Sequence, residues 1–174
     1  MSIANLPQLF MRHPDLTKLP PLIHPEGFSL QTPEPGMEPV WESLIEKAFG
    51  NRYAFDAVIS SADNYDPSQV LYILKDGIII ATTTATEKDW FPGEGWFRMV
   101  GVTPEARGQG AGRMIGLAAL HALAKQGYKT AVLSTDDFRL PALGLYFSLG
   151  FEPLMNHESH PARWEAVMEK LGKK

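Results

Sequence analysis

The chain has 174 residues, with 44% hydrophobic and 21% charged content, which suits one globular domain with a single substantial core. Its formal net charge of −4 argues against a general nucleic-acid binder, and the absence of cysteine excludes disulfides, thiolate metal sites and a cysteine nucleophile. No apolar run reaches the roughly 18 residues of a membrane span, and the first residues lack the basic head and apolar core expected of a secretory signal. We therefore expect no nucleic-acid or membrane partner, and a cytoplasmic location as the default.

The first 39 residues hold eight of the fourteen prolines, which prevents a long helix in this region. Residues 1–24 are expected to form an extended N-terminal arm that lies on the domain, because their apolar side chains argue against a disordered tail. A first strand is predicted over 28–32. Apolar residues at helical spacing, a proline in the first turn and a following glycine predict a helix over 38–49.

The middle of the chain has the clearest β pattern. After a short helix at about 54–61, two β-rich runs, 69–75 and 78–86, surround an Asp-Gly pair and predict a hairpin. A turn at 90–95 leads to a strand over 96–102.

The remaining elements alternate. They are a helix to about residue 126, a strand at 130–135, a helix at 138–149, a strand from Phe151 and an amphipathic helix at 161–171. No repeat or linker divides the chain. We expect one mixed α/β domain over residues 1–174, in the order β-α-α-β-β-β-α-β-α-β-α.

The most informative segment joins the strand at 96–102 to the following helix through three glycines, Gly108, Gly110 and Gly112. Glycine lets the backbone turn tightly or approach a ligand closely, and the free N–H groups of a helix start bind phosphate oxygens. Arg107 and Arg113 add positive charge. The segment lacks the Gly-Lys-Ser/Thr ending of a nucleotide P-loop, and Arg113 stands where a dinucleotide fingerprint needs its third glycine. A phosphorylated cofactor of another class is the prediction, with a glycine-rich structural turn as the alternative.

Two motifs resemble those of the GNAT superfamily of N-acetyltransferases. Arg107-Gly-Gln-Gly110-Ala-Gly112, after Val102-Thr-Pro104, is similar to the acetyl-CoA signature of that superfamily. Tyr146, followed by Gly150-Phe151, is similar to a later motif in which a helix carries a tyrosine and ends at a Gly-Phe pair. The resemblance is strong over 96–153. It implies a central, mostly antiparallel mixed sheet flanked by helices, although a helix stands here where many members end with another strand.

The resemblance implies transfer of an acetyl group from acetyl-CoA to a primary amine of a small molecule or peptide. Direct transfer in a ternary complex is expected, since the chain has no cysteine that could carry the acetyl group. No metal is expected, and the oligomeric state is left open, a homodimer included. Longer acyl donors and a non-catalytic acyl-CoA-binding module of the same fold are the alternatives. The residues that it assigns to the cofactor are Met99, Val100, Val102, Arg107, Gly108, Gln109, Gly110, Ala111, Gly112 and Arg113.

Tyr146 is the predicted catalytic residue, because a phenol can donate a proton or hydrogen bond to the leaving thiolate. Its alternative is a core tyrosine on an amphipathic helix. Many members of the superfamily carry asparagine seven residues earlier, where this chain has Arg139.

The general base is not identified by the sequence. Four acidic residues near the expected cleft, Glu87, Asp89, Glu94 and Asp136, are candidates, each with a surface or helix-capping alternative. Arg98 is interpreted as a solvated strand arginine, with an acceptor carboxylate as its alternative partner. His157 and His160 are interpreted as part of a polar loop, with a metal site as the weaker alternative.

Overall fold

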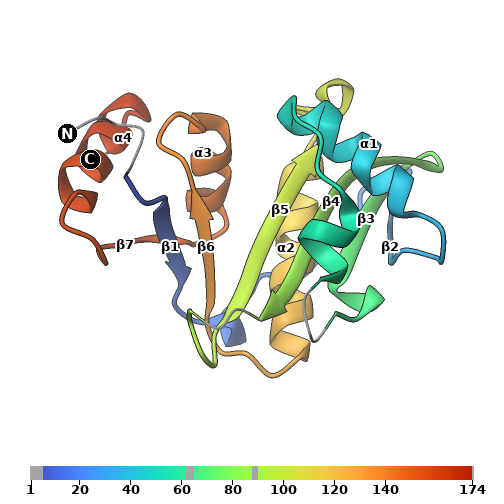
Figure 1. Ribbon diagram of the computed structural model, residues 1–174, viewed down its shortest axis with the longest axis horizontal. Helices are drawn as coiled ribbons and strands as arrows, with labels where there is room; N and C mark the ends of the chain where they lie inside the picture. Colours follow the sequence, from blue (N-terminus) through green and yellow to red (C-terminus); the bar gives the residue numbers. More distant parts are fainter. Residues whose placement is uncertain (1–5, 62–64, 88–89, 174) are drawn as a thin grey trace.

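The structure is a computed structural model that describes residues 6–61, 65–87 and 90–173. Its centre is a seven-stranded mixed sheet with the order β2-β3-β4-β5-β6-β1-β7 (Figure 1). The strands are β1 (Leu9–His13), β2 (Phe28–Gln31), β3 (Val70–Lys75), β4 (Ile78–Glu87), β5 (Gly95–Val102), β6 (Ala131–Thr135) and β7 (Glu152–Leu154). The helices are α1 (Glu38–Phe49), α2 (Ala111–Lys125), α3 (Leu140–Ser148) and α4 (His160–Lys170), with short turns η2 (Leu16–Lys18), η3 (Asp56–Ser60), η4 (Pro67–Gln69) and η5 (Pro104–Ala106).

The strongest local patterns are confirmed. α1 has the predicted bounds and ends at Gly50, which is left-handed at φ 76°. The β3–β4 hairpin turns at Asp76 and Gly77, both at positive φ, as a type I′ turn requires. The predicted short helix near 54–61 is the single π-helical turn η3.

The N-terminal arm differs from the prediction. Residues 9–13 are not a surface arm. They form β1, an inner strand of the sheet that is antiparallel to β6 on one side and to β7 on the other. Leu9 and Met11 alternate with less buried neighbours and are fully buried themselves. Five residues between two prolines give too short a pattern for local propensity to identify, so tertiary pairing decides the strand. The predicted order therefore lacked one strand, and residues 1–5 lie outside the described part.

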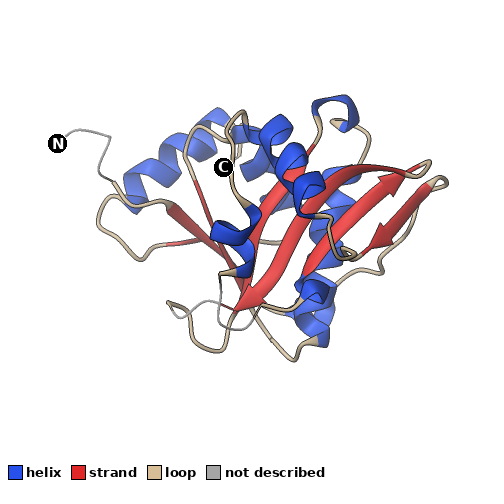
Figure 2. Cartoon of the chain, turned by 45° about the vertical axis from the view of Figure 1, so that its right-hand side comes forward, coloured by secondary structure: helices blue, strands red, loops and turns tan. Residues whose placement is uncertain are grey.

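Helices cover both faces of the sheet (Figure 2). α2 packs its apolar residues, among them Ile115, Leu120 and Leu123, into the larger core cluster. α1 covers the opposite face, where Trp41 and Ile45 join a second buried cluster with residues of β3 and η3. Burial of these side chains holds the sheet between two layers, because each one removes apolar surface from water.

The feature that shapes the functional site is the divergence of β5 and β6. These parallel strands pair only at Gly95↔Ala131 and Trp96↔Val132, and beyond these pairs they separate into a V (Figure 1). Gly95 permits the close approach of α2 at this junction, since a Cβ there would lie 2.7 Å from Leu123 Cδ2. The sheet thus consists of two halves joined at the point of the V.

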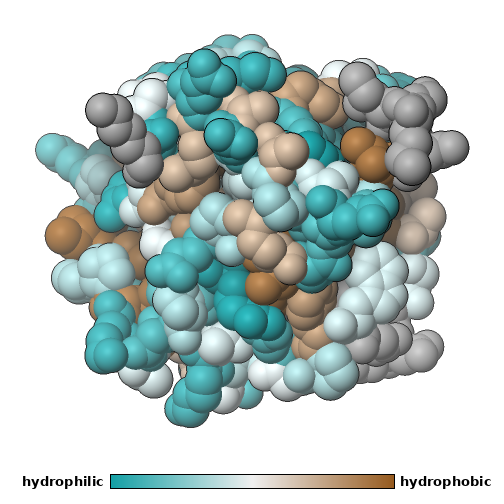
Figure 3. Space-filling view, turned by 90° about the vertical axis from the view of Figure 1, so that its left-hand side faces the viewer, coloured by the Kyte–Doolittle hydropathy of each residue, from teal (hydrophilic) through white to brown (hydrophobic). Residues whose placement is uncertain are grey.

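α4 covers the outer side of the β1–β7 half. It buries Trp164 and Val167 and leaves its charged residues outside. Hydrophilic residues accordingly spread over the face shown in Figure 3, with small hydrophobic areas between them. Among the described residues, no helix has both the length and the apolar character that a bilayer crossing requires.

Candidate active site

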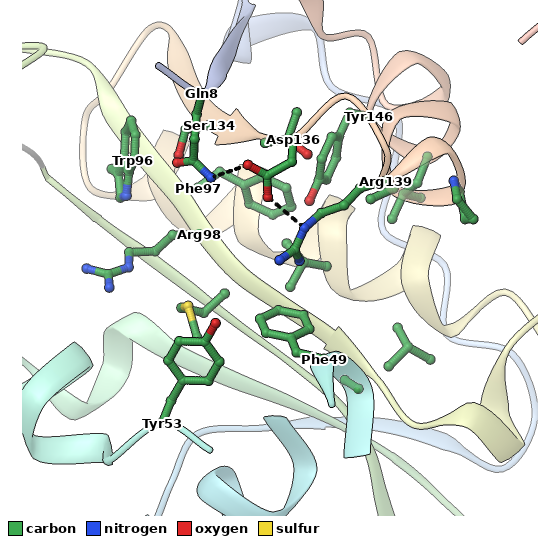
Figure 4. A pocket seen from close by; sticks show the side chains of 18 of the residues that line it. Gln8, Phe49, Tyr53, Trp96, Phe97, Arg98, Ser134, Asp136, Arg139 and Tyr146 are labelled. Atoms are coloured by element: carbon green, nitrogen blue, oxygen red, sulfur yellow. Dashed lines mark hydrogen bonds and ion pairs between the residues drawn. The ribbon is translucent and has the colours of Figure 1, made fainter. Parts of the chain in front are cut away.

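A cavity of about 650 Å³ fills the opening between β5 and β6. Its walls come from the C-terminal end of α1, from β5, from the end of β6 and from α3, with Gln8 reaching in from the arm (Figure 4). Of the predicted cofactor residues, four line the cavity: Met99, Val100, Val102 and Arg107. The cavity therefore follows the inner edge of β5 from the junction to the glycine loop.

A β-bulge interrupts β5 beside the cavity. The β4–β5 register shifts between Thr82 and Thr84, so that Thr83 faces two residues of β5, and Met99 has a φ of 54°. The Thr83 hydroxyl donates to the Arg98 carbonyl at 3.1 Å and fixes this irregular segment. A positive φ is costly for a side-chain-bearing residue, and bulges next to binding sites redirect backbone groups.

The glycine loop turns at two left-handed residues, Gly108 (φ 74°) and Gly110 (φ 84°), and the second is the N-cap of α2. At both positions the direction of a Cβ is open, without a described atom within 4 Å. Gly112 has a different role, because a Cβ there would lie 3.3 Å from Leu145 Cδ2, a residue of the cavity wall. Gly108, Gln109, Gly110, Ala111, Gly112 and Arg113 thus form the turn and the helix start beyond the end of the cavity.

The two loop arginines bind neighbouring helices. Arg107 Nη2 donates to the Ala48 carbonyl of α1 at 3.1 Å, and Arg113 Nη1 donates to the Ser148 carbonyl of α3 at 2.8 Å. Each of these bonds uses one N–H of a guanidinium that carries five. The remaining donors of both side chains stay available to a ligand, as do the first N–H groups of α2, which lack intrahelical acceptors.

Tyr146 lies in the cavity wall on α3 and is 8% exposed. Its ring packs edge-on against Phe97, with centroids 5.8 Å apart, and against Phe151 at 6.1 Å, while its hydroxyl points into the cavity (Figure 4). Burial raises the pKa of Tyr146 to about 12, and the nearby charges of Arg139 and Asp136 shift it in opposite directions. The phenol is therefore neutral at physiological pH and suited to donate a hydrogen bond.

A polar chain crosses the cavity next to Tyr146. Arg139 Nε donates to Asp136 at 2.9 Å, and Gln8 Nε2 donates to the other Asp136 oxygen at 3.1 Å. The Arg139 guanidinium also lies over the Phe49 ring, 5.0 Å from its centroid. This arrangement brings together the arm, α1 and the start of α3 (Figure 4). Sequence reasoning noted Arg139 only as a departure from the superfamily pattern and missed Gln8 and Phe49, which no motif marks.

The four acidic candidates for the general base differ in whether they line the cavity. Asp136 lines the cavity, whereas Glu94 forms an ion pair with Arg12 at 2.7 Å and does not line it. Glu87 is also outside the lining, and Asp89 lies outside the described residues. The capping alternative for Asp136 is wrong, because the N-cap of α3 is Arg139 and no side chain caps this helix.

His157 and His160 lie near each other, with ring centroids 5.6 Å apart. His160 is fully buried and its Nδ1 lies 3.1 Å from the Leu154 carbonyl, while His157 Nδ1 contacts the Ser159 hydroxyl at 2.9 Å. Both rings therefore have local structural partners outside the cavity.

Comparison with known proteins agrees with this geometry. The family model "Acetyltransferase (GNAT) family" matches residues 37–151. Mycothiol acetyltransferase from Thermomonospora curvata is 33% identical over 153 residues, which cover 82% of this chain and 50% of that protein. The enzyme of the same name from Thermobispora bispora is 32% identical, with 81% and 52% covered. The chain spans about half the length of these curated relatives.

Solved structures share the fold. A GCN5-related N-acetyltransferase from Sphaerobacter thermophilus superposes with a TM-score of 0.71 at 25% identity, covering 86% of this chain and 50% of that one. The ribosomal-protein-S18-alanine N-acetyltransferase from Escherichia coli superposes with a TM-score of 0.62 at 20% identity, covering 74% and 79%. The family match extends over most of the chain and includes the diverging strands, the glycine loop and Tyr146. The chain therefore belongs to the GNAT acetyltransferase family.

Proposed function

We propose that the protein transfers an acetyl group from acetyl-CoA to the primary amine of a small molecule or peptide. The observation that carries the proposal is the cavity between β5 and β6, open along one strand edge and ending at a glycine-rich helix start. A strand edge offers unpaired N–H and C=O groups, and the start of a helix attracts phosphate oxygens. Both features fit the two chemical parts of coenzyme A.

We assign successive parts of coenzyme A to successive residues along the cavity. The open Cβ directions at Gly108 and Gly110 leave room for a pyrophosphate beside the N–H groups of α2. Arg107 and Arg113 border this position, and the backbone of Met99, Val100 and Val102 would pair with the pantetheine arm. Bound acetyl-CoA would supply an activated thioester near the β5 bulge.

The protein's own contribution to the chemistry is then hydrogen bonding and positioning. Tyr146 donates to the leaving thiolate from within the cavity. Because its pKa is about 12, full proton transfer to a thiolate whose conjugate acid has a pKa of about 8.5 is uphill. Stabilisation by the hydrogen bond is the main effect. Asp136 already accepts from Arg139 and Gln8, so it holds Arg139 in place. The proton that the amine loses balances the proton that the released thiolate gains.

Release of free thiol from acetyl-CoA across a library of primary amines tests the proposal. Amine-dependent release, with the acetylated amine identified by mass spectrometry, is the expected result. Tight binding of acetyl-CoA without turnover of any amine would instead support a non-catalytic acyl-CoA-binding module. Turnover only with longer acyl donors would replace acetyl-CoA as the donor.

A further inference from the structure

Arg98 stands out among the charged residues of the cavity. Its sequence interpretation as a solvated strand arginine is wrong, because the side chain is partly buried and lines the cavity. Nη2 donates to the Val58 carbonyl of η3 at 3.0 Å. Burial lowers the pKa of Arg98, and no charged neighbour among the described residues offsets this effect.

The described lining of the cavity has a net positive charge. Three arginines and one aspartate line it, although the chain as a whole has a net charge of −4. Arg139 forms an ion pair with that aspartate, Asp136. Arg107 belongs to the glycine loop and donates a hydrogen bond to the Ala48 carbonyl. Arg98 forms no ion pair with any carboxylate of the residues that the structure describes. A partly buried cation without an anion has lost part of its hydration, so an anionic ligand would stabilise it.

The position of Arg98 assigns this anion to the acceptor. β5 runs from the strand junction to the glycine loop, and Arg98 precedes the bulge at Met99, whereas Val100 and Val102 follow it. The thioester end of the cofactor would stop at the bulge, so Arg98 lies beyond it. In Figure 4 its guanidinium extends away from Asp136, Arg139 and Tyr146, on the side of the cavity where Trp96 lies.

We infer that the acceptor is an amino acid whose carboxylate binds Arg98 while its amino group faces the β5 bulge. The inference rests on the proposed acetyl transfer and names its substrate class. A planar guanidinium forms paired hydrogen bonds with a carboxylate, and the Val58 carbonyl holds its opposite side. Aromatic rings of the same cavity lining, among them Trp96 and Tyr53, offer an apolar surface to the amino-acid side chain.

The test uses pairs of acceptors that differ in the carboxylate alone. Thiol release is measured with the common L-amino acids, their amides and the corresponding amines that lack the carboxylate, for example L-phenylalanine, L-phenylalaninamide and phenethylamine. The expected kcat/KM is at least tenfold higher for the carboxylate member of a pair. Arg98→Gln should remove this preference through a higher KM for the amino acid, with the amide and amine within about threefold of wild type. Arg98→Lys should restore part of it.

Controls separate this inference from general damage and from failure of the proposed function. Arg52→Gln is the matched variant, because Arg52 pairs with Glu46 at the surface and does not line the cavity; it should leave all rates unchanged. Turnover of amines without any preference for a carboxylate would overturn the inference and leave acetyl transfer standing. If no amine is acetylated, calorimetric titration of amino acids into the CoA-loaded protein still tests the carboxylate site. Binding that Arg98→Gln abolishes supports the carboxylate site, and absence of binding overturns it.

Discussion

At the residue scale, Tyr146 combines a structural position with the catalytic role that we propose for it. Its ring belongs to the core, between Phe97 and Phe151, while its hydroxyl faces the cavity. Tyr146→Phe keeps the ring, so we expect a nearly unchanged melting temperature and KM for acetyl-CoA, with turnover lower by about 10²-fold or more. Since the pKa is raised to about 12, the tyrosine stays protonated, and wild-type turnover should show no loss from its ionisation below about pH 10. Steady-state kinetics decide; turnover within threefold of wild type would remove Tyr146 from the mechanism.

Gly110 offers the sharpest test of the phosphate-binding role that we propose for the glycine loop. Its φ of 84° would strain a β-branched residue, so asparagine, which tolerates this conformation, is the better substitution. Gly110→Asn should weaken CoA binding at least tenfold, about 1.4 kcal/mol, by filling the open space beside the helix start. Gly127 is the control, since it has a φ of 99° and equally open space at the other end of α2. Calorimetry should find unchanged affinity in Gly127→Asn; equal effects of both substitutions would refute the loop assignment.

At the scale of elements, β1 joins the N-terminal segment to the sheet between β6 and β7. His13 ends this strand, is 8% exposed and stacks edge-on with Phe151 at 5.6 Å. Burial lowers the pKa of His13, although the Leu149 backbone and the charges of Asp15 and Glu152 act in the opposite direction. The unfolded chain therefore binds more protons, and stability present at neutral pH is lost as the pH falls below about 6.5.

Urea unfolding at pH 7.5 and pH 5.5 measures this contribution. Wild type should lose stability at the lower pH, and His13→Gln should show a smaller difference between the two conditions, even if it is less stable overall. His24→Gln, at an exposed position of the arm, should keep the wild-type difference. An unchanged pH response in His13→Gln would show that the acid sensitivity arises elsewhere.

The elements also show where sequence reasoning succeeds and where it fails. α1, the β3–β4 hairpin and the glycine loop were predictable because their signals are local: periodicity, an Asp-Gly turn and spaced glycines. β1 was not, because Leu9 and Met11 become strand residues only through pairing with β6 and β7. The same limit applies to the site. Phe49, Gln8 and Arg98 meet in one cavity through tertiary packing, and no short motif contains them.

At the scale of the whole molecule, the sheet is two halves joined at two residue pairs, Gly95↔Ala131 and Trp96↔Val132. Side-chain contacts across the open end, such as Arg139 over Phe49, add to this junction. A ligand that lies between the halves would contact both, so its binding energy would stabilise the whole fold. By linkage, CoA at 100 times its Kd adds about 2.7 kcal/mol to the free energy of unfolding.

Hydrogen exchange can locate that added stability. The backbone of β5 beyond Trp96 does not pair with β6, whereas β4 pairs with β3 and with β5. If the pantetheine arm pairs with β5 as an added strand, saturating CoA should slow amide exchange in residues 97–102 at least tenfold. Residues 78–87 should change less, because their ladders are already complete. At a CoA concentration close to the wild-type Kd, Gly110→Asn should show a much smaller effect than wild type. Unchanged exchange in 97–102 while calorimetry shows CoA bound would mean that the cofactor follows another path across the cavity.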